Sequence, residues 1–307
     1  MKTILLWVPL ALMAVVGITG SYFLGEAFRV EARDAWKAEA AQAAQWVSGT
    51  IVGWLGENYT PLTGLAILFE NSSEVTPDEF LGAADALEAR ATSSFLVSKS
   101  VARPVKGMED WSVEYTDDSL GTLARGTLLG RYPAILETVK VAAVRPGRII
   151  LGPPFMVGDG RSRSPLVLFV RDARGPLAII GLIDFKAIIG RLLEIHKTES
   201  ISIQIEGRFA KAEGHGPRRT IIGRPLPGAP QAATNGVVSA GAELSITCYF
   251  DERFRNGPKE ELANFTLLGG TAGAILITLL VGMLLHRNRM VARMVRAATS
   301  DLAESRQ

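Results

Sequence analysis

The chain has little of the residue chemistry that catalysis and metal binding use. It contains one cysteine, Cys248, so no internal disulfide forms and a zinc site made of several cysteines is excluded. Its three histidines are scattered, and none belongs to an H-x-x-x-H pair. We therefore predict no enzymatic activity, no catalytic residue, no metal and no cofactor.

Two short acidic segments do not change that prediction. Residues 158–160 (Gly-Asp-Gly) lack the third glycine of a phosphate-binding loop and the helix that follows it, so we expect a turn. The adjacent Asp117 and Asp118 have no base nearby in the sequence. We expect both carboxylates to lie in a solvated loop.

Excess charge of either sign is also missing, because 33 basic and 31 acidic residues give a formal net charge of +2. This balance argues against a nucleic-acid partner. The hydrophobic residues, by contrast, gather in two uncharged runs, 4–24 and 265–285. Each run is long enough to cross a bilayer core of about 30 Å as a helix. A buried core helix would show a polar face, which neither run has.

Basic residues set the predicted orientation in the membrane. The second run is followed by four arginines before the next acid, at positions 287, 289, 293 and 296. The positive-inside rule places this tail in the cytoplasm, and two spans then place the N-terminus there as well. We predict a multi-pass protein of the bacterial inner membrane with residues 26–264 in the periplasm. The first run is longer than a signal-peptide core, and no A-x-A-like site follows it, so we expect an uncleaved anchor.

The segment 26–61 is rich in helix-forming residues and nearly free of helix breakers. Its apolar residues recur at imperfect spacings of three and four, which predicts a helix continuing out of the first span. The apolar face is wide enough to pack on a partner helix or on its own domain. Pro61 is expected to end or kink this helix, and a short apolar helix to resume over 62–69.

A helix start is predicted within 69–80 (FENSSEVTPDEF). Thr76 and Glu79 have the spacing of a capping box, in which each side chain bonds the other residue's backbone N–H. Pro77 suits the first helical position. Val75 and Phe80 occupy the positions of a hydrophobic staple. The acidic pair Asp78 and Glu79 therefore has a structural role in this interpretation.

Strands dominate the rest of the region between the two runs. After a helix at 80–91, a strand at 95–101 and a helix at 133–144, we expect a broken strand at 148–157 and a hairpin of central strands, 166–171 and 177–183. Asp184 is expected to cap another helix. Further strands are predicted at 201–206, 236–240 and 242–250, with 211–235 mostly loop around one short strand at 219–222. This order predicts an α+β domain with two antiparallel-sheet lobes.

Four segments of the chain resemble the CHASE family of extracytoplasmic sensory domains. They are LAILFENSSEVTPDEF (65–80), GRIILGPPF (147–155), the hairpin with its following helix (166–193), and VVSAGAELSITCYFDERF (237–254), which leads to the second run. The resemblance implies a long dimerisation helix, two PAS-like lobes, a ligand pocket and a homodimer. The Cache sensors are a close alternative, because the hairpin and the sequence LIDF (182–185) also suit them.

The candidate ligand-binding residues are Gly152, Phe155, Phe169, Arg171 and Gly181. Phe169 and Arg171 lie on one face of a strand, where an aromatic ring and a guanidinium suit a flat or anionic ligand. The glycines and Phe155 would shape a pocket. In the alternative, Phe169 is a core residue, Arg171 a charge at a strand end, and the glycines allow close backbone packing.

The predicted organisation is a first transmembrane helix (1–25), a juxtamembrane dimerisation helix (26–61), a periplasmic sensor domain (62–264), a second transmembrane helix (265–285) and a cytoplasmic signalling helix (286–307). An apolar seam in the last segment predicts a short coiled coil, with a plain stop-transfer helix as the alternative. We predict a receptor that binds a small ligand and signals to a cytoplasmic effector domain or protein. The alternative function is an envelope scaffold that binds proteins without signalling.

Overall fold

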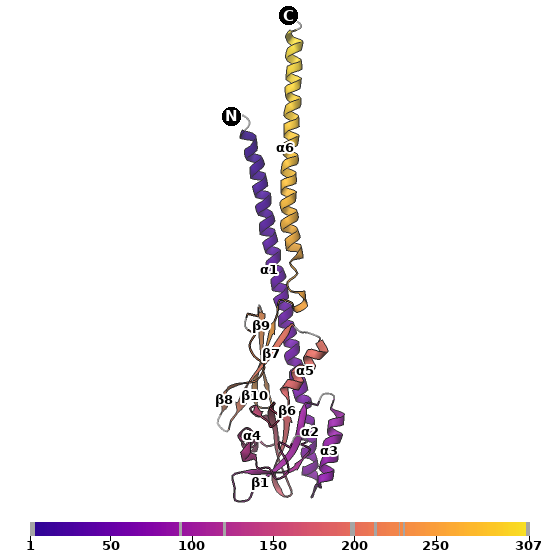
Figure 1. The fold of residues 1–307 in the computed structure, drawn as a ribbon, viewed down its shortest axis with the longest axis vertical. Helices are drawn as coiled ribbons and strands as arrows, with labels where there is room; N and C mark the ends of the chain where they lie inside the picture. Colours follow the sequence, from indigo (N-terminus) through magenta and orange to yellow (C-terminus); the bar gives the residue numbers. More distant parts are fainter. Residues whose placement is uncertain are drawn as a thin grey trace. The chain divides into compact units, whose positions relative to one another are not determined.

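The computed structural model describes residues 4–91, 94–118, 121–196, 200–211, 214–226, 228–229 and 231–304 (Figure 1). The chain divides into two compact units, one of Met1–Ala38 with Asn256–Gln307 and the other of Glu39–Arg255. Helix α1 (Ile4–Glu57) contributes to both units. The fold is α+β, as predicted, with a long N-terminal helix, antiparallel sheets and a C-terminal helix.

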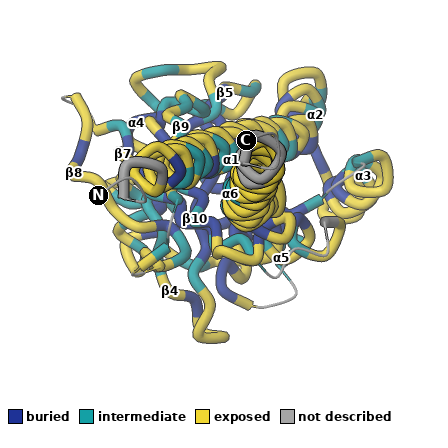
Figure 2. Tube along the Cα trace, turned by 90° about the horizontal axis from the view of Figure 1, so that it is seen from above, coloured by how far each residue is buried: buried dark blue, intermediate teal, exposed yellow. Residues whose placement is uncertain are grey.

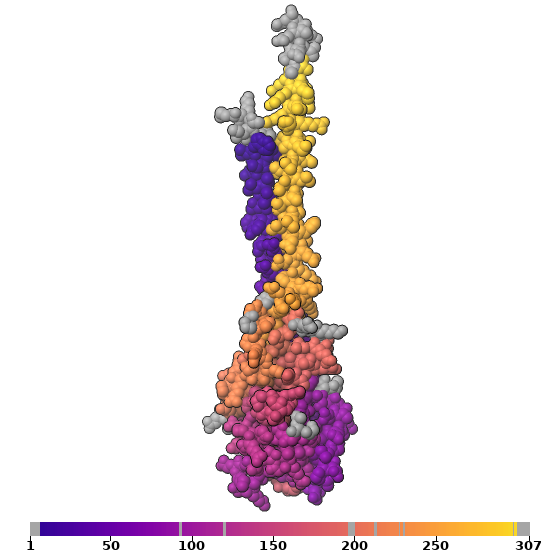
Figure 3. Space-filling model, in the orientation of Figure 1, coloured from indigo at the N-terminus to yellow at the C-terminus, as the bar shows by residue number. Residues whose placement is uncertain are grey.

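The first unit pairs the N-terminal part of α1 with α6 (Glu261–Glu304), and the two helices lie side by side (Figures 1 and 3). Both helices are long and apolar enough to cross a membrane, and 11% of the most apolar window in α1 and 0% of that in α6 is buried. A core helix of a soluble protein would be mostly buried.

Small residues bring the two helices of this unit together. A Cβ atom added to Gly17 would lie 2.6 Å from the Ala274 Cβ, and one added to Gly270 would lie 2.4 Å from the Ser21 Oγ. Such close helix contact between small side chains is typical of membrane-spanning helices. Beyond the apolar stretch, Arg33 Nε donates to Glu260 Oε1 at 3.0 Å, a contact that joins the polar ends of α1 and α6.

The second unit begins with the C-terminal third of α1, which ends at Glu57, four positions before Pro61, where the break was predicted. Asn58 marks the break, donating from Nδ2 to the Trp54 carbonyl at 2.7 Å and accepting at Oδ1 from the Phe95 N–H at 2.8 Å. Pro61 lies instead in the first turn of α2 (Tyr59–Asn71), where a missing N–H costs little. The expected break at Pro61 was therefore wrong in position.

The predicted capping box is confirmed at the start of α3 (Pro77–Arg90). The Glu79 N–H donates to Thr76 Oγ1 at 3.3 Å, and the Thr76 N–H donates to Glu79 Oε2 at 2.8 Å. The bonds that the Glu79 carboxylate accepts from the Thr76 N–H and hydroxyl lower the pKa of this carboxyl. Val75 and Phe80 are both buried, as a hydrophobic staple requires.

A six-stranded antiparallel sheet, here called the first sheet, follows in the chain. Its order is β2-β1-β6-β5-β3, with β4 paired to β5. The strands are β1 (Leu96–Pro104), β2 (Trp111–Thr116), β3 (Ile149–Leu151), β4 (Phe155–Met156), β5 (Ser162–Asp172) and β6 (Gly175–Ile183). A short helix, η1 (Leu129–Arg131), precedes α4 (Pro133–Ala143). The predicted hairpin is β5–β6, and both strands are central, as expected.

Helices cover both faces of the first sheet. Val167 and Ile180 are paired across β5 and β6, and both belong to a core that includes Ile135 and Val139 of α4. The next residue, Gly181, points to the opposite face, where a Cβ atom would lie 3.1 Å from Leu62 of α2. Burial on both faces explains why β5 and β6 are almost entirely apolar.

The second sheet has four antiparallel strands in the order β8-β7-β10-β9. They are β7 (Ile201–Ala210), β8 (His215–Ile222), β9 (Gln231–Ser239) and β10 (Ala242–Phe250), followed by η2 (Phe254–Asn256). The strands β8 and β9 begin earlier than predicted, within the segment expected to be loop. In sequence, Gly216, Pro217 and the arginines of β8 and the small and polar residues of β9 resemble a loop, but these strands pair along the edges of the sheet, where such residues are tolerated.

The C-terminal third of α1 packs within the second unit. Its residues Ala40, Ala44, Val47, Ile51 and Leu55 are buried. Beside them, Ser48 Oγ accepts from Asn235 Nδ2 of β9 at 3.1 Å. Figure 2 shows buried residues among the interior strands and exposed residues along α6. Part of the predicted dimerisation helix therefore serves as a core element of the second unit.

Candidate functional site

A cavity of about 220 Å³ lies at the junction of the two sheets within the second unit. It is lined by one side of β4 and β5, by the start of helix α5 (Phe185–His196), and by the end of β8. The lining residues are Met156, Gly160, Arg161, Ser162, Ser164, Phe185, Lys186, Ile221 and Ile222. A ligand here would contact both sheets and the helix that connects them.

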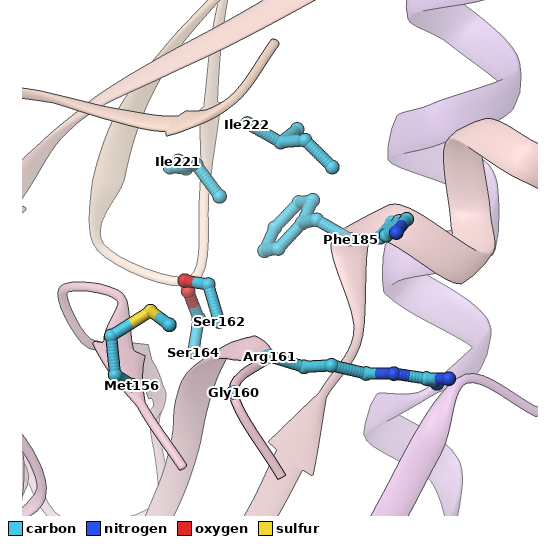
Figure 4. Close-up of a pocket in the computed structure, with 9 residues that line it drawn as sticks. Met156, Gly160, Arg161, Ser162, Ser164, Phe185, Ile221 and Ile222 are labelled. Carbon is cyan, nitrogen blue, oxygen red and sulfur yellow. The ribbon is translucent and has the colours of Figure 1, made fainter.

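Two serines of β5 supply the polar groups inside this cavity. Ser162 and Ser164 are two positions apart, so both point to the same face of the strand. Figure 4 shows their side chains directed into the space bounded by Met156, Phe185 and the two isoleucines. Their register partners across the sheet are Met156 and Ile183. The cavity therefore has apolar walls with two hydroxyl groups on one side.

The Ser164 hydroxyl is the most informative group in the site. The residue is 0% exposed, and its Oγ has no hydrogen-bond partner among the described residues. A buried polar group without a partner costs roughly 1–3 kcal/mol of folding free energy. A bound molecule or water in the cavity would relieve that cost, because a hydroxyl both donates and accepts.

Arg163, between the two serines, points to the other face and fixes the start of β5. Its guanidinium lies 3.0 Å from Asp159 Oδ2 and 3.3 Å from Asp184 Oδ2. Asp184 also caps α5, because its Oδ1 accepts from the Lys186 N–H at 2.8 Å. This confirms the predicted cap. Arg163 thus links the strand that carries the serines to the helix that carries Phe185.

The five residues predicted as ligand contacts lie elsewhere on the first sheet. Phe169 is buried in the core beside α4, with its ring centroid 6.0 Å from that of Trp111, whereas Arg171 is exposed near the end of β5. Phe155 packs on Tyr132 at 5.8 Å between centroids. The structure therefore brings Phe155 and Phe169 to one core and leaves Arg171 outside it.

The two predicted glycines lie where backbones pack closely. A Cβ atom at Gly152 would be 2.0 Å from Thr138 Oγ1 of α4, and one at Gly181 would be 2.9 Å from Leu96 Cδ2. Their small size allows helices to approach opposite faces of the sheet. None of the five predicted residues is among those that line the junction cavity.

The acidic pair after β2 is partly buried and both carboxylates accept hydrogen bonds, which corrects the expectation of a solvated loop. Asp117 Oδ2 lies 2.7 Å from the Nζ of Lys99, a β1 residue whose side chain is 2% exposed, and Glu88 Oε2 lies 2.6 Å from the same atom. Asp118 accepts from the Leu123 N–H at 2.5 Å. Burial alone would lower the pKa of Lys99, but hydrogen bonds and charges from Asp117 and Glu88 raise it. These acids neutralise a buried cation that is distant in sequence.

Other reactive groups in the described part of the chain form no site. Burial raises the pKa of the Cys248 thiol to about 12, which makes it a poor nucleophile at neutral pH. No group of three or more histidine, cysteine, aspartate or glutamate residues that could hold a metal is found among the described residues.

Comparisons with known proteins give remote likenesses only. No protein-family model and no curated protein matches the chain. Among solved structures, the ligand-binding domain of the Pseudomonas aeruginosa PAO1 amino-acid chemoreceptor PctC, in complex with GABA, is 15% identical, with 69% of this chain and 100% of that chain covered at a TM-score of 0.47. The periplasmic sensory domain of the Campylobacter jejuni chemoreceptor Tlp1 is 12% identical, with 76% and 96% covered at 0.46.

A third structure has a similar score. The ligand-binding domain of the Pseudomonas aeruginosa chemoreceptor PctB, in complex with L-Arg, is 12% identical, with 81% of this chain and 99% of that chain covered at a TM-score of 0.44. These structures are sensory domains of bacterial chemoreceptors. At such identities and scores, the likenesses assign neither a ligand nor a family to this chain, and the resemblance to CHASE domains stays a prediction.

Proposed function

We propose that this chain is the sensory and membrane-spanning region of a bacterial signal-transduction receptor. The second unit binds a small molecule at the junction of its two sheets. The observation that carries this proposal is the fully buried Ser164 hydroxyl, which has no partner among the described residues and faces a cavity of about 220 Å³. The domain is CHASE-like in this proposal, with a Cache-like sensor as the alternative.

Ligand binding at the junction of the two sheets would affect the second transmembrane helix through the second sheet. The cavity touches β8, and β10 of the same sheet leads through η2 toward α6. A ligand that prefers one arrangement of the two sheets would shift the equilibrium between arrangements by its difference in affinity. We propose that α6 transmits this shift to a cytoplasmic effector, and that two copies of the chain act as a homodimer.

The membrane arrangement is part of the proposal. Two spans place both termini in the cytoplasm and residues 26–264 in the periplasm, following the arginines after the second apolar run. A topology reporter fused at Gln307 should be active only where cytoplasmic reporters are active. An extracytoplasmic signal from that fusion would refute the orientation.

Thermal unfolding of the full chain in lipid nanodiscs, with a library of small metabolites, tests the binding function. A ligand that binds only the folded state raises the Tm as its concentration exceeds the Kd. We expect at least one compound to stabilise the wild type and to lose its effect in Ser164→Val, where an apolar side chain replaces the hydroxyl. Arg171→Ala tests the other possible pocket, the one formed by the five residues predicted from the sequence. Only a ligand bound in that pocket would lose its effect on the Tm in this variant.

The outcome that would overturn the sensor function is equally specific. If no compound changes the Tm, and envelope proteins co-purify with the full chain in stoichiometric amounts, the chain is a protein-binding scaffold. In that case, the junction cavity holds only water that satisfies Ser164.

A further inference from the structure

We infer that the junction cavity takes a small carboxylate with a short apolar body and no amino group. The inference rests on the proposed function and names the chemical class of its ligand. It follows from the charges, the hydroxyls and the walls of the cavity, taken in turn.

The charged side chains that line the cavity are both cationic. Arg161 lies in the turn between β4 and β5, and Lys186 lies in the first turn of α5; both are exposed at the rim. No acidic side chain is among the lining residues in the described part of the chain. A ligand ammonium group would therefore enter without a counter-charge, whereas a carboxylate would enter a positive potential. Figure 4 shows the Arg161 side chain directed away from the two serines, so Arg161 contributes charge at a distance and not by contact with the carboxylate.

The two nearby carboxylates share one cation on the opposite side of β5. Asp159 and Asp184 both pair with the Arg163 guanidinium, whose side chain is 2% exposed. Their oxygens also accept backbone N–H groups, Asp159 from Arg161 at 2.9 Å and Asp184 from Lys186 at 2.8 Å. These acids are therefore engaged in ion pairs and backbone hydrogen bonds on the other side of β5. One guanidinium balances only one of the two carboxylates, but with Arg161 and Lys186 the five groups carry three positive and two negative charges, a net charge of +1 that favours an anion over an amine.

The two serine hydroxyls suit the oxygens of a carboxylate. A carboxylate only accepts hydrogen bonds, and each hydroxyl has one proton to donate. Ser164 Oγ has no acceptor among the described residues, so its proton is available to the ligand. Hydrogen bonds to an ionised group are about twice as strong as those between neutral groups. The ligand that gains most from Ser162 and Ser164 is therefore an anion.

The walls limit the rest of the ligand. Phe185, Ile221 and Ile222 lie on the side opposite the serines, and Met156 lies beside the serines on the neighbouring strand (Figure 4). A volume of about 220 Å³ lies below the range of about 300–1,000 Å³ for drug-sized ligands, which favours a small acid over a large or sugar-bearing one. An apolar body of a few carbons would fill the space and leave the carboxylate at the hydroxyls and the cationic rim.

Four probes of matched size test the inference: butanoate, butanamide, butylamine and L-2-aminobutanoate. Each is titrated into the full chain in nanodiscs at constant ionic strength, with chloride as the salt control, and binding is followed by Tm and by calorimetry. We expect butanoate to bind most tightly and the amine and amino acid not to bind. The Kd for butanoate should rise about tenfold or more in Ser164→Ala and several-fold in Arg161→Gln.

Ser98→Ala is the matched control for Ser164→Ala. Ser98 is also a buried serine of the first sheet, 1% exposed and without a described partner for its Oγ, but it does not line the cavity. Its substitution should leave the Kd for butanoate unchanged. If Ser164→Ala fails to fold, Ser162→Ala provides the same test from the neighbouring hydroxyl.

The outcomes separate this inference from the proposed function. Binding of butylamine or the amino acid that depends on Ser164, with no binding of butanoate, overturns the ligand class and leaves the receptor function intact. Butanoate binding that is equal in wild type and Ser164→Ala also overturns the inference, because the site would lie elsewhere. Failure of all probes together with the whole metabolite library overturns the proposed function itself.

Discussion

The two sheets of the second unit are both antiparallel but differ in how their faces are covered. In the first sheet, eight consecutive residues of β5 and the last seven of β6 are buried. In β10, a central strand of the second sheet, every second residue from Ala242 to Phe250 is buried, and the residues between them are intermediate or exposed except Ser245. A sheet covered on two faces needs apolar residues at every position, whereas a sheet with one open face needs them at every second position. The amino-acid composition of a strand therefore indicates whether other elements cover one face of its sheet or both.

The charged pairs of the two sheets also differ in how far they are exposed to water. On the first sheet, Arg103 pairs with Asp172 and with Glu114, and the Arg103 and Asp172 side chains are only 16% and 5% exposed. On the second sheet, Arg208 and Glu243 are register partners 3.5 Å apart, with 50% and 46% exposure. The first cluster is partly desolvated and the second pair is screened by water, so their energies should differ.

The largest expected loss of stability is that of Gly152→Ala, which adds a single methyl group beside the first sheet. In Gly152→Ala the new Cβ would meet Thr138 Oγ1 at 2.0 Å and Pro165 Cγ at 2.7 Å, so α4 must move away from the sheet. Overpacking of this kind destabilises by about 1–3 kcal/mol. We expect thermal unfolding of the full chain in nanodiscs to shift to a clearly lower Tm.

Gly236→Ala in β9 is the matched control. A Cβ atom at Gly236 meets nothing within 4 Å, and alanine is preferred to glycine in a strand interior because it loses less backbone entropy. We expect a change within about 0.5 kcal/mol. Equal losses in the two variants would mean that the first sheet is not packed more tightly than the second.

The next effect is that of Asp172→Asn, which removes the charge that faces Arg103. Burial alone would raise the pKa of Asp172, but the hydrogen bonds and charge of Arg103 lower it below its ordinary value. At neutral pH we expect a loss of roughly 2 kcal/mol, because hydrogen bonds to charged groups contribute about 1.5–3 kcal/mol. Urea unfolding of the wild type and the variant would measure it.

The pH dependence of this effect has a definite sign. Since the folded-state pKa of Asp172 is lowered, its contribution is complete above the unfolded-state value of about 4 and is lost as the pH falls through the folded-state value. The stability gap between wild type and Asp172→Asn should therefore narrow below about pH 4. A gap that stays constant or widens on acidification would contradict the role assigned to the Arg103 pair.

Much of the fold was predictable because its signals are local. The capping box at Thr76, the cap at Asp184, the β5–β6 hairpin and the strand β10 each depend on residues within a few positions of one another. Such signals survive without tertiary information. The edge strands β8 and β9 were predicted too short because their pairing with the neighbouring strands, not their composition, makes them strands.

The candidate site was less predictable because it depends on contacts that are distant in sequence. Ser164 looks like an ordinary strand residue until Ile221 of β8 and Phe185 of α5 close over it. One local signal was present, since the polar start of β5 (Ser-Arg-Ser, 162–164) precedes an otherwise apolar strand. Likewise, nothing beside Asp117 in the sequence indicates that it pairs with Lys99, which is 18 residues away.

A smaller loss of stability is expected at α3. This helix packs against α2, which covers one face of the first sheet. Thr76→Ala removes the hydroxyl that caps α3 and should destabilise by about 1 kcal/mol. Thr76→Ser keeps the hydroxyl and should lose a few tenths of a kcal/mol at most. Hydrogen exchange of the first turn of α3 would locate the loss. Faster exchange in both variants alike would show that the hydroxyl has no part in the cap.

The smallest expected effect is at the exposed pair of the second sheet. A double-mutant cycle of Arg208→Gln and Glu243→Gln should give a coupling energy below about 1 kcal/mol, because both side chains are about half exposed and are screened by salt. The same cycle applied to Arg103→Gln and Asp172→Asn should give a larger coupling that is less sensitive to salt, because those side chains are desolvated. If the two couplings are equal, coverage of the sheet does not control the strength of its charge pairs, and the difference between the sheets is one of apolar packing alone.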